Sequence, residues 1–258
     1  MYELSALEAA LGSSIYAGKL HFSPVTGSTN TDALEAARAG APHGSVFFTD
    51  EQTAGRGRGD HAWHSASAQG VYVSVLLRPE LPAVRLPLLP LAAGLAAAEA
   101  IAEASGLTAD LRWPNDLLLG ERKTGGILAE AQTDSGIVSY AVVGIGINVH
   151  QSRFAPDLAT PATSLDLESG RVISRQALLI ALLESLEQET LALRGAAEAK
   201  TIPQRVGLAS TWVRGRRVEV HGPQACTGIT EGLDENGFLL VRTANGLMRI
   251  QTGGIRAA

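Results

Sequence analysis

The spacing of hydrophobic residues predicts several helices in the first three quarters of the chain. Apolar positions recur every three or four residues over 91–102 and again over 179–193, after Ser174, which can cap a helix start. Shorter helices are expected over 7–11 and 33–38. A helix with one apolar face must bury that face against another layer of the protein.

Five runs rich in β-branched and apolar residues lie among these helices and predict strands. They cover residues 45–49, 71–77, 111–113, 126–130 and 139–149. Because helices and strands alternate, the fold class expected for this part of the chain is α/β.

The pattern changes after Val206, where glycines recur every few residues and separate short apolar runs. These runs cover residues 218–220, 238–241 and 247–250. Short strands with frequent turns are typical of a small all-β module, most simply a small barrel. We therefore predict two domains, an α/β domain over residues 1–205 and a β-barrel over residues 206–258.

The composition is that of a globular protein without unusual charge. The 258 residues are 45% hydrophobic and 18% charged, and the net charge of −5 argues against a basic nucleic-acid binder. The lone cysteine, Cys226, allows no intrachain disulfide, so a reducing compartment is expected. The N-terminus lacks a signal-peptide pattern, and proline, glycine and glutamate interrupt the most apolar stretch, residues 86–104. We therefore expect a cytoplasmic protein without membrane contact.

Several standard site patterns are not met. Residues 55–59 and 144–149 do not match the dinucleotide-binding pattern G-x-G-x-x-G, and residues 120–124 lack the earlier glycine of a P-loop. His61 and His64 lack a third ligand of the kind that zinc needs. The sequence therefore predicts neither a Rossmann cofactor site, nor a P-loop, nor a zinc centre.

A loop rich in glycine and arginine is the most unusual segment. Arg56 and Arg58 alternate with three glycines between two predicted strands. Glycine lets backbone N–H groups approach an anion closely, and guanidinium groups bind phosphate oxygens in pairs. The loop is therefore a candidate anion site, with a flexible solvated loop and an RNA contact as the alternatives.

Polar residues also lie beside predicted strands. Pro114 bends the chain after a short strand, so Asn115 and Asp116 emerge at a strand end, where ligands often meet α/β sheets. Lys123 precedes a double glycine, and Asn148 ends a strand that contains two glycines. Each feature has an ordinary alternative: a common turn, a surface lysine and core packing.

Taken in order, these segments resemble the biotin protein ligases. The matching segments are residues 28–30, 52–58, 63, 113–116, 122–130 and 144–149. The C-terminal module is also similar to the SH3-like domain of that family. The resemblance implies a mixed sheet with helices, like that of class II aminoacyl-tRNA synthetases, followed by a small SH3-like β-barrel.

The sequence departs from the family pattern at two places. Gly59, Asp60 and His61 stand where the family usually has another basic-glycine-basic stretch, so the closure of this loop is expected to differ in detail. Arg112 replaces a common lysine, which keeps the charge but changes the hydrogen-bond geometry. The short N-terminal segment has no room for the DNA-binding domain of some members, so neither DNA binding nor a repressor role is expected.

The resemblance implies a two-step, ATP-dependent reaction. Biotin is adenylated to biotinyl-5′-AMP and then transferred to a lysine of a biotin carboxyl carrier protein, such as the acetyl-CoA carboxylase subunit. ATP and Mg²⁺ are the implied cofactors, biotin is the substrate, and a monomer or homodimer is expected. A lipoate or octanoate ligase or transferase of the same fold, and a non-catalytic ligand- or RNA-binding protein, remain the alternatives.

The resemblance also implies which residues serve each substrate. Lys123, Arg58 and Asp116 are implied as catalytic, and Asp116 also as the Mg²⁺ ligand. The implied biotin site consists of Ser28, Thr29, Asn30, Gln52, Arg56, Gly57, Arg58 and Lys123. The implied ATP site consists of Arg58, Arg112, Asn115, Asp116 and Asn148.

Overall fold

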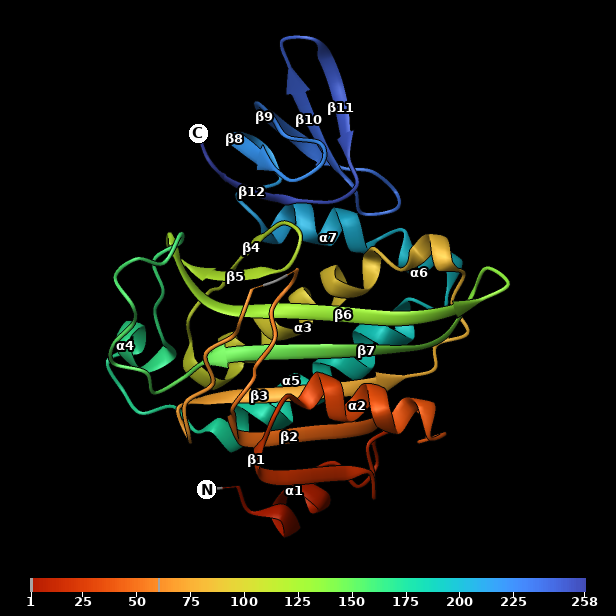
Figure 1. Cartoon of the computed structure of the whole chain (residues 1–258), viewed down its shortest axis with the longest axis vertical. Coiled ribbons are helices and arrows are strands. Elements are labelled where there is room, and N and C mark those ends of the chain that lie inside the picture. The colour runs from red at the N-terminus through yellow and green to blue at the C-terminus, as the bar shows by residue number, and fades with distance from the viewer. Residues whose placement is uncertain (1, 60) are drawn as a thin grey trace.

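The computed structural model describes residues 2–59 and 61–258, which form a larger sheet flanked by helices and a smaller C-terminal sheet (Figure 1). Seven strands within these residues make the larger sheet, in the order β1-β2-β3-β7-β6-β5-β4. The β1–β2 pair is parallel and the other neighbours are antiparallel, so the predicted mixed sheet is confirmed. The strands are β1 (Leu20–Thr26), β2 (Ser45–Gln52), β3 (Gly70–Leu77), β4 (Asp110–Arg112), β5 (Asp116–Leu119), β6 (Arg122–Asp134) and β7 (Ile137–Asn148).

The centre of the larger sheet is covered on both faces. All eight residues of β3 are buried, whereas every residue of β1, at the sheet edge, is exposed or half-buried. Strands covered on both faces read as continuous apolar runs. This explains why the sequence predicted β3 and β7 but not β1.

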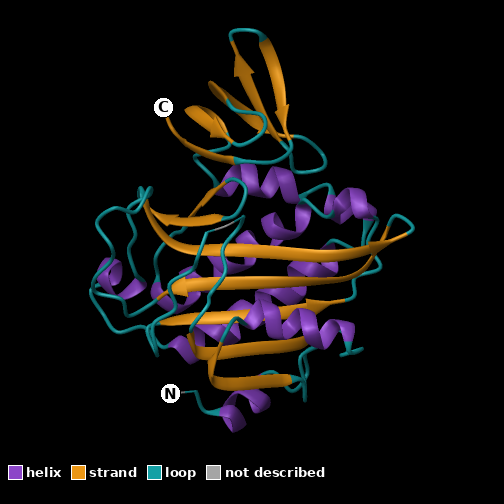
Figure 2. Ribbon diagram, in the orientation of Figure 1, coloured by secondary structure: helices purple, strands orange, loops and turns teal. Residues whose placement is uncertain are grey.

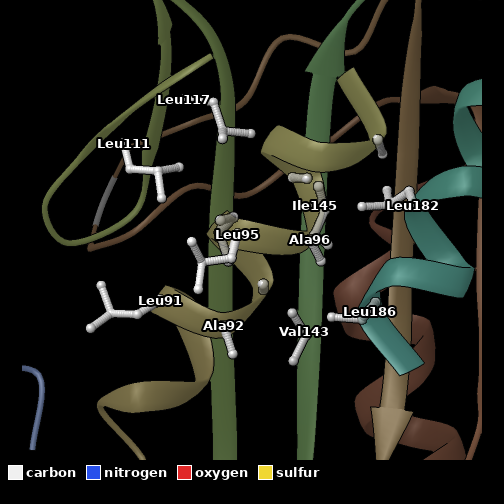
Figure 3. Close-up of a cluster of buried hydrophobic side chains, with 14 of the residues drawn as sticks. Leu91, Ala92, Leu95, Ala96, Leu111, Leu117, Val143, Ile145, Leu182 and Leu186 are labelled. Carbon is white, nitrogen blue, oxygen red and sulfur yellow. The ribbon is translucent and has the colours of Figure 1, made fainter. Parts of the chain in front are cut away.

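Helices pack on the two faces of this sheet (Figure 2). Helix α2 (Thr29–Arg38) lies against β2, β3 and β7, while α3 (Leu88–Ser105) and α5 (Arg175–Ala192) pack together on the opposite face. Figure 3 shows Leu95 of α3, Ile145 of β7 and Leu182 of α5 in one buried cluster. The remaining helical segments are α1 (Leu4–Ala10), η1 (Ala83–Arg85), α4 (Leu165–Ser169), α6 (Ala196–Ala199) and α7 (Ile202–Ala209).

Helix α3 is the core helix of the protein. Among the described residues, it is the one helix whose length and composition would allow it to cross a membrane. However, 61% of it is buried inside the fold. Gly106 ends it at φ 72°, in the left-handed region that favours glycine. At the start of α5, the Ser174 hydroxyl accepts a hydrogen bond from the Ala177 N–H at 3.2 Å, which confirms the predicted cap.

The C-terminal strands form a second, antiparallel sheet beyond α7 (Figure 1). Its order is β11-β10-β9-β8-β12, so the predicted all-β module is confirmed. Within the described residues β11 and β12 form the two edges of an open sheet, rather than closing the expected barrel. The strands are β8 (Arg214–His221), β9 (Cys226–Leu233), β10 (Leu239–Thr243), β11 (Gly246–Ile250) and β12 (Gly254–Ala257).

The two sheets are joined by buried contacts. The Trp113 indole N–H donates to the Gly237 carbonyl at 3.0 Å, from the turn between β9 and β10. A Cβ atom at Gly237 would lie 2.7 Å from Leu91 of α3, so this turn packs directly on the core helix. The smaller sheet is thereby held close to β4 and to the polar segment that follows it.

Two elements near that segment differ from the sequence prediction. β5 is a four-residue strand that begins two residues after Pro114 and is held by pairing with β4 and β6. β6 begins at Arg122 rather than at residue 126, so Lys123 lies within a strand. The glycines that follow Lys123 pair with β5 and β7 instead of forming a loop.

Candidate active site

A cleft of about 910 Å³ lies between the larger sheet, the loop before β3 and the C-terminal sheet. The structure brings all the predicted site residues together, because every one of them lines this cleft. They are Ser28, Thr29, Asn30, Gln52, Arg56, Gly57, Arg58, Arg112, Asn115, Asp116, Lys123 and Asn148.

The start of α2 presents polar groups to the cleft instead of capping itself. Ser28 occupies the N-cap position, but its side chain makes no capping hydrogen bond. The Thr29 N–H donates to Gln52 Oε1 at 2.9 Å, and the Thr29 hydroxyl lies 2.8 Å from the Ser74 hydroxyl. Gln52 Nε2 in turn donates to Ser65 Oγ at 2.7 Å. The polar residues 28–30 thus serve the cleft.

Asn30 is fixed in one orientation by its neighbours. Its Oδ1 accepts a hydrogen bond from Ser74 Oγ at 2.6 Å, and its Nδ2 donates to Glu130 Oε2 at 2.9 Å. Gly144 of β7 makes room for this amide, because a Cβ atom there would lie only 2.0 Å from Asn30 Oδ1. The glycine within β7 therefore marks a close approach of a side chain.

The glycine-arginine loop folds back on itself as a hairpin. The Gly57 N–H donates to the His61 carbonyl at 2.7 Å, and the Trp63 N–H donates to the Gly55 carbonyl at 2.9 Å. The Arg56 guanidinium is paired with both oxygens of Glu130, at 2.7 and 2.9 Å. Its charge is therefore compensated by Glu130. Asp60, one of the departures from the family pattern, lies outside the described residues.

Arg58 connects the loop to the C-terminal sheet. Its guanidinium donates to the Gly253 carbonyl and, at 3.0 Å, to the Thr252 hydroxyl, both just before β12. Burial lowers the pKa of Arg58, and the carboxylate of Asp116 opposes this shift. A guanidinium keeps its proton at any physiological pH, so Arg58 is a partly desolvated cation in the cleft.

Asp116 is held between two cations. Its Oδ1 lies 2.5 Å from Lys123 Nζ, and its Oδ2 lies 2.6 Å from Arg112 Nη2. Burial by itself would raise the pKa of Asp116, but Lys123 and Arg112 outweigh it and hold the pKa below its usual value. The three groups together carry one net positive charge, which suits binding of an anion.

Trp63 lies on the glycine-rich floor of the cleft. A Cβ atom at Gly146 would lie 2.5 Å from Trp63 Nε1, and one at Gly126 would lie 3.2 Å from its ring. Lys123 Nζ is 5.5 Å from the centroid of the indole ring, within the range of a cation–π contact. Trp63 Nε1 is buried without a hydrogen-bond partner among the described residues.

The two asparagines predicted for the nucleotide help to hold the cleft wall. Asn115 Nδ2 donates to the Ile127 carbonyl at 2.9 Å, and Asn148 Nδ2 donates to the Thr163 carbonyl at 3.0 Å. Gln151 Nε2 donates to Asn148 Oδ1 at 3.3 Å. A primary amide has two N–H donors and two acceptor lone pairs, so both asparagines keep hydrogen-bonding capacity for a ligand.

Sequence reasoning missed Thr252 and Gly253, which line the cleft, and Ser74 and Glu130, which bind the lining residue Asn30 from behind. Ser74 is a fully buried polar residue in an apolar strand, which was a usable signal. Glu130 falls inside a matching segment but received no role. Thr252 and Gly253 carried no local signal, because their contribution depends on how the second sheet is placed.

Comparison with known proteins agrees with this architecture. The profile of the Biotin/lipoate A/B protein ligase family matches residues 22–148, and that of the Biotin protein ligase C terminal domain matches residues 214–255. The bifunctional ligase/repressor BirA of Bacillus subtilis is 34% identical over 256 residues, which cover 97% of this chain and 78% of that protein. The biotin--[acetyl-CoA-carboxylase] ligase of Mycobacterium tuberculosis is 34% identical over 89% of this chain and 85% of its own length.

A solved structure shows the same fold. The biotin protein ligase from Aquifex aeolicus in complex with biotin and ATP superposes with a TM-score of 0.79 at 28% identity, over 93% of this chain and all of that one. The chain therefore belongs to the Biotin/lipoate A/B protein ligase family. Within that family, the matched C-terminal domain and the named relatives place it among the biotin protein ligases, which are enzymes of the ligase class.

Proposed function

We propose that this ligase adenylates biotin with ATP and then transfers the biotinyl group to a lysine of a biotin carboxyl carrier protein. The observation that carries the proposal is one cleft that gathers Arg58, Lys123 and the polar start of α2. Guanidinium and ammonium groups suit a carboxylate and phosphates, and amide and hydroxyl groups suit a ureido ring, which both donates and accepts hydrogen bonds.

The chemistry needs two steps because a carboxylate resists attack by an amine. In the first step a carboxylate oxygen of biotin attacks the α-phosphorus of ATP, the bond to the bridging oxygen breaks, and pyrophosphate leaves. In the second step the neutral amine of the acceptor lysine attacks the carbonyl carbon of biotinyl-5′-AMP. The bond from that carbon to the phosphate oxygen breaks, AMP leaves, and the nitrogen that becomes the amide loses one proton to solvent.

The start of α2 and the end of β2 recognise the ureido ring. Thr29, Asn30 and Gln52 line the same wall of the cleft and carry donors and acceptors, with Ser28 beside them. Their mutual hydrogen bonds fix their orientations before the substrate arrives. A preorganised polar site loses less conformational entropy on binding, which favours affinity for a ligand that matches it.

The cations act on the carboxylate and the phosphates. Lys123 and Arg58 stabilise the negative charge that develops on the α-phosphate, and their partial burial strengthens this interaction. Arg56 and Gly57 border the carboxylate end of biotin. Arg112, Asn115 and Asn148 contact the nucleotide.

Asp116 acts by holding cations rather than by accepting a proton. The lowered pKa of Asp116 makes it a weak base, which argues against the role of deprotonating the incoming lysine. Both of its oxygens are already bound by Lys123 and Arg112, so its carboxylate does not fit a Mg²⁺ ligand. Residues 2–59 and 61–258 hold no group of three His, Cys, Asp or Glu side chains placed for a metal ion. No step of this mechanism is therefore assigned to a protein-held Mg²⁺.

Trp63 shields the reactive intermediate. Its indole packs over Gly126 and Gly146 and beside Lys123, so it covers the position where the cations would meet the mixed anhydride. Exclusion of water from this position would protect biotinyl-5′-AMP from hydrolysis.

Biotin-dependent exchange of labelled pyrophosphate into ATP tests the first step. We expect exchange with biotin and none with lipoate or octanoate. Transfer is tested with a purified carrier domain, and a carrier whose acceptor lysine is replaced by arginine serves as the control. Exchange with lipoate or octanoate in place of biotin would assign the enzyme to that alternative class, and no exchange with any of the three acids would refute the proposal.

A further inference from the structure

We propose that Glu130 of β6 is a positioning residue for the biotin half of the cleft, an inference that rests on the proposed function. One carboxylate joins two parts of the site that come from distant stretches of the chain. Its Oε1 accepts a hydrogen bond from Arg56 Nη2 at 2.7 Å. Its Oε2 accepts hydrogen bonds from Arg56 Nη1 and from Asn30 Nδ2, both at 2.9 Å.

Glu130 and the Leu128 carbonyl together decide which way the Asn30 amide points, because Asn30 Nδ2 donates to Glu130 Oε2 at 2.9 Å and to the carbonyl at 3.4 Å. An ionised carboxylate has only acceptors, so the Asn30 atom that faces it must be the nitrogen. The amide oxygen then faces Ser74, whose hydroxyl donates to it at 2.6 Å. One lone pair of this oxygen remains for a ligand, and a ureido N–H is the donor that fits it.

Glu130 also fastens the middle of the glycine-arginine loop. The base of the loop is closed by the hydrogen bond from Gln52 Nε2 to Ser65 Oγ. Between these ends, the Arg56–Glu130 pair binds the loop to the sheet, in addition to the contact of Arg58 with the C-terminal sheet. The backbone of Gly57 is therefore placed over the biotin half by an ion pair as well as by its own turn.

A continuous chain of hydrogen bonds connects these positions. It runs from Gln52 through the Thr29 N–H and hydroxyl to Ser74, Asn30, Glu130 and Arg56. Glutamine at position 130 could not replace the carboxylate, because its amide has one acceptor oxygen and would turn donors toward Arg56 or Asn30. The substitution therefore loosens the loop and leaves the Asn30 amide nitrogen with only its longer hydrogen bond to the Leu128 carbonyl, while the cations around Asp116 are untouched.

The first test is the Glu130→Gln variant in biotin-dependent pyrophosphate exchange. Because the ion pair of Glu130 is partly exposed, solvent limits the energy lost with it, and we expect the KM for biotin to rise by only about tenfold. The KM for ATP is expected to stay within about twofold, because a site for one substrate has been changed and the other has not. Trypsin cleavage after Arg56 and Arg58 should become faster by a similar factor.

Glu231→Gln is the matched control. Glu231 of β9 also forms a two-pronged pair, with Arg242 of β10, but Arg242 does not line the cleft, whereas Arg56 and Asn30, the partners of Glu130, do. We expect its loss to change neither KM nor the cleavage of the loop. A purely structural role for Glu130 would lower thermal stability and active fraction without separating the two KM values.

The outcomes separate this inference from the proposed function. A wild-type enzyme without biotin-dependent exchange would overturn the proposed function itself. A wild-type enzyme with exchange, and a folded Glu130→Gln variant with an unchanged KM for biotin, would overturn the role of Glu130. Should that variant fail to fold, Glu130→Asp keeps the charge but is too short to reach both partners, and an unchanged KM for biotin in it would equally overturn the role.

Discussion

Replacing Lys123 by alanine separates its chemical role from its structural one. Lys123 Nζ lies 2.5 Å from Asp116 Oδ1, and its side chain is 27% exposed. Its removal leaves Asp116 paired with Arg112 at 2.6 Å, so no carboxylate is left buried and alone. The local charge falls from one net positive charge to zero, which removes the attraction for an anion at this position.

The structural cost of Lys123→Ala is expected to be small. Loss of a partly exposed ion pair whose partner keeps a second cation costs about 1 kcal/mol. For a protein of this size that lowers Tm by roughly 2–4 °C. The variant should therefore stay folded under assay conditions.

The catalytic cost is expected to be much larger. Loss of one group that stabilises developing negative charge typically slows a reaction by about 10²–10³-fold. Initial rates of biotin-dependent pyrophosphate exchange at saturating biotin and ATP measure this loss. Lys200→Ala is the control, since Lys200 is an exposed residue after α6 and does not line the cleft. A folded Lys123→Ala variant that exchanges pyrophosphate within threefold of wild type would remove Lys123 from the mechanism.

Two further predictions follow from the packing of the cleft. Asp116→Asn should cost about 3–5 kcal/mol of unfolding free energy at pH 7, because it leaves two cations without their shared carboxylate. The pKa of Asp116 is lowered in the folded protein, so the stabilisation by its carboxylate is complete above about pH 4 and is lost as the pH falls through the folded value. Urea unfolding of wild type and variant between pH 3 and 7 should show the difference in unfolding free energy shrinking toward low pH. A difference that stays constant with pH would contradict this. Gly146→Ala places a Cβ atom 2.5 Å from Trp63 Nε1, so it should displace the indole, lower stability by about 1–3 kcal/mol and raise the rate of biotinyl-5′-AMP hydrolysis. Gly207→Ala in α7, where a Cβ atom meets nothing within 4 Å, should do neither, and an equal effect of the two substitutions would refute the assignment.

The C-terminal sheet is part of the cleft and not only a neighbour of it. Thr252 and Gly253 bind Arg58 of the loop, and the turn at Gly237 packs on Trp113 next to the polar segment. Arg112 connects the two regions further, because it lies 5.2 Å from the ring of Trp212, the residue that leads into β8, and also binds Asp116. The position of the second sheet is thus tied to residues on both sides of Lys123.

Much of this protein is determined locally by its sequence. Continuous apolar runs fixed β3, β7 and the core of α3, because strands and helices covered on all sides need apolar residues at nearly every position. The ordered motifs also carried the resemblance to the biotin protein ligases, and that resemblance named the candidate residues. Residue chemistry alone indicated an anion site at Arg56 and Arg58.

Other features were decided only by tertiary structure. β1 and β5 have weak patterns of their own and exist because neighbouring strands supply their hydrogen-bond partners. The pairing of Arg56 with Glu130 joins residues 74 positions apart, and that of Arg58 with Thr252 joins residues 194 apart. Hydrogen bonds and direct ion pairs form only between groups that lie a few ångströms apart. Which charges compensate one another therefore follows from the folded arrangement and not from distance along the chain.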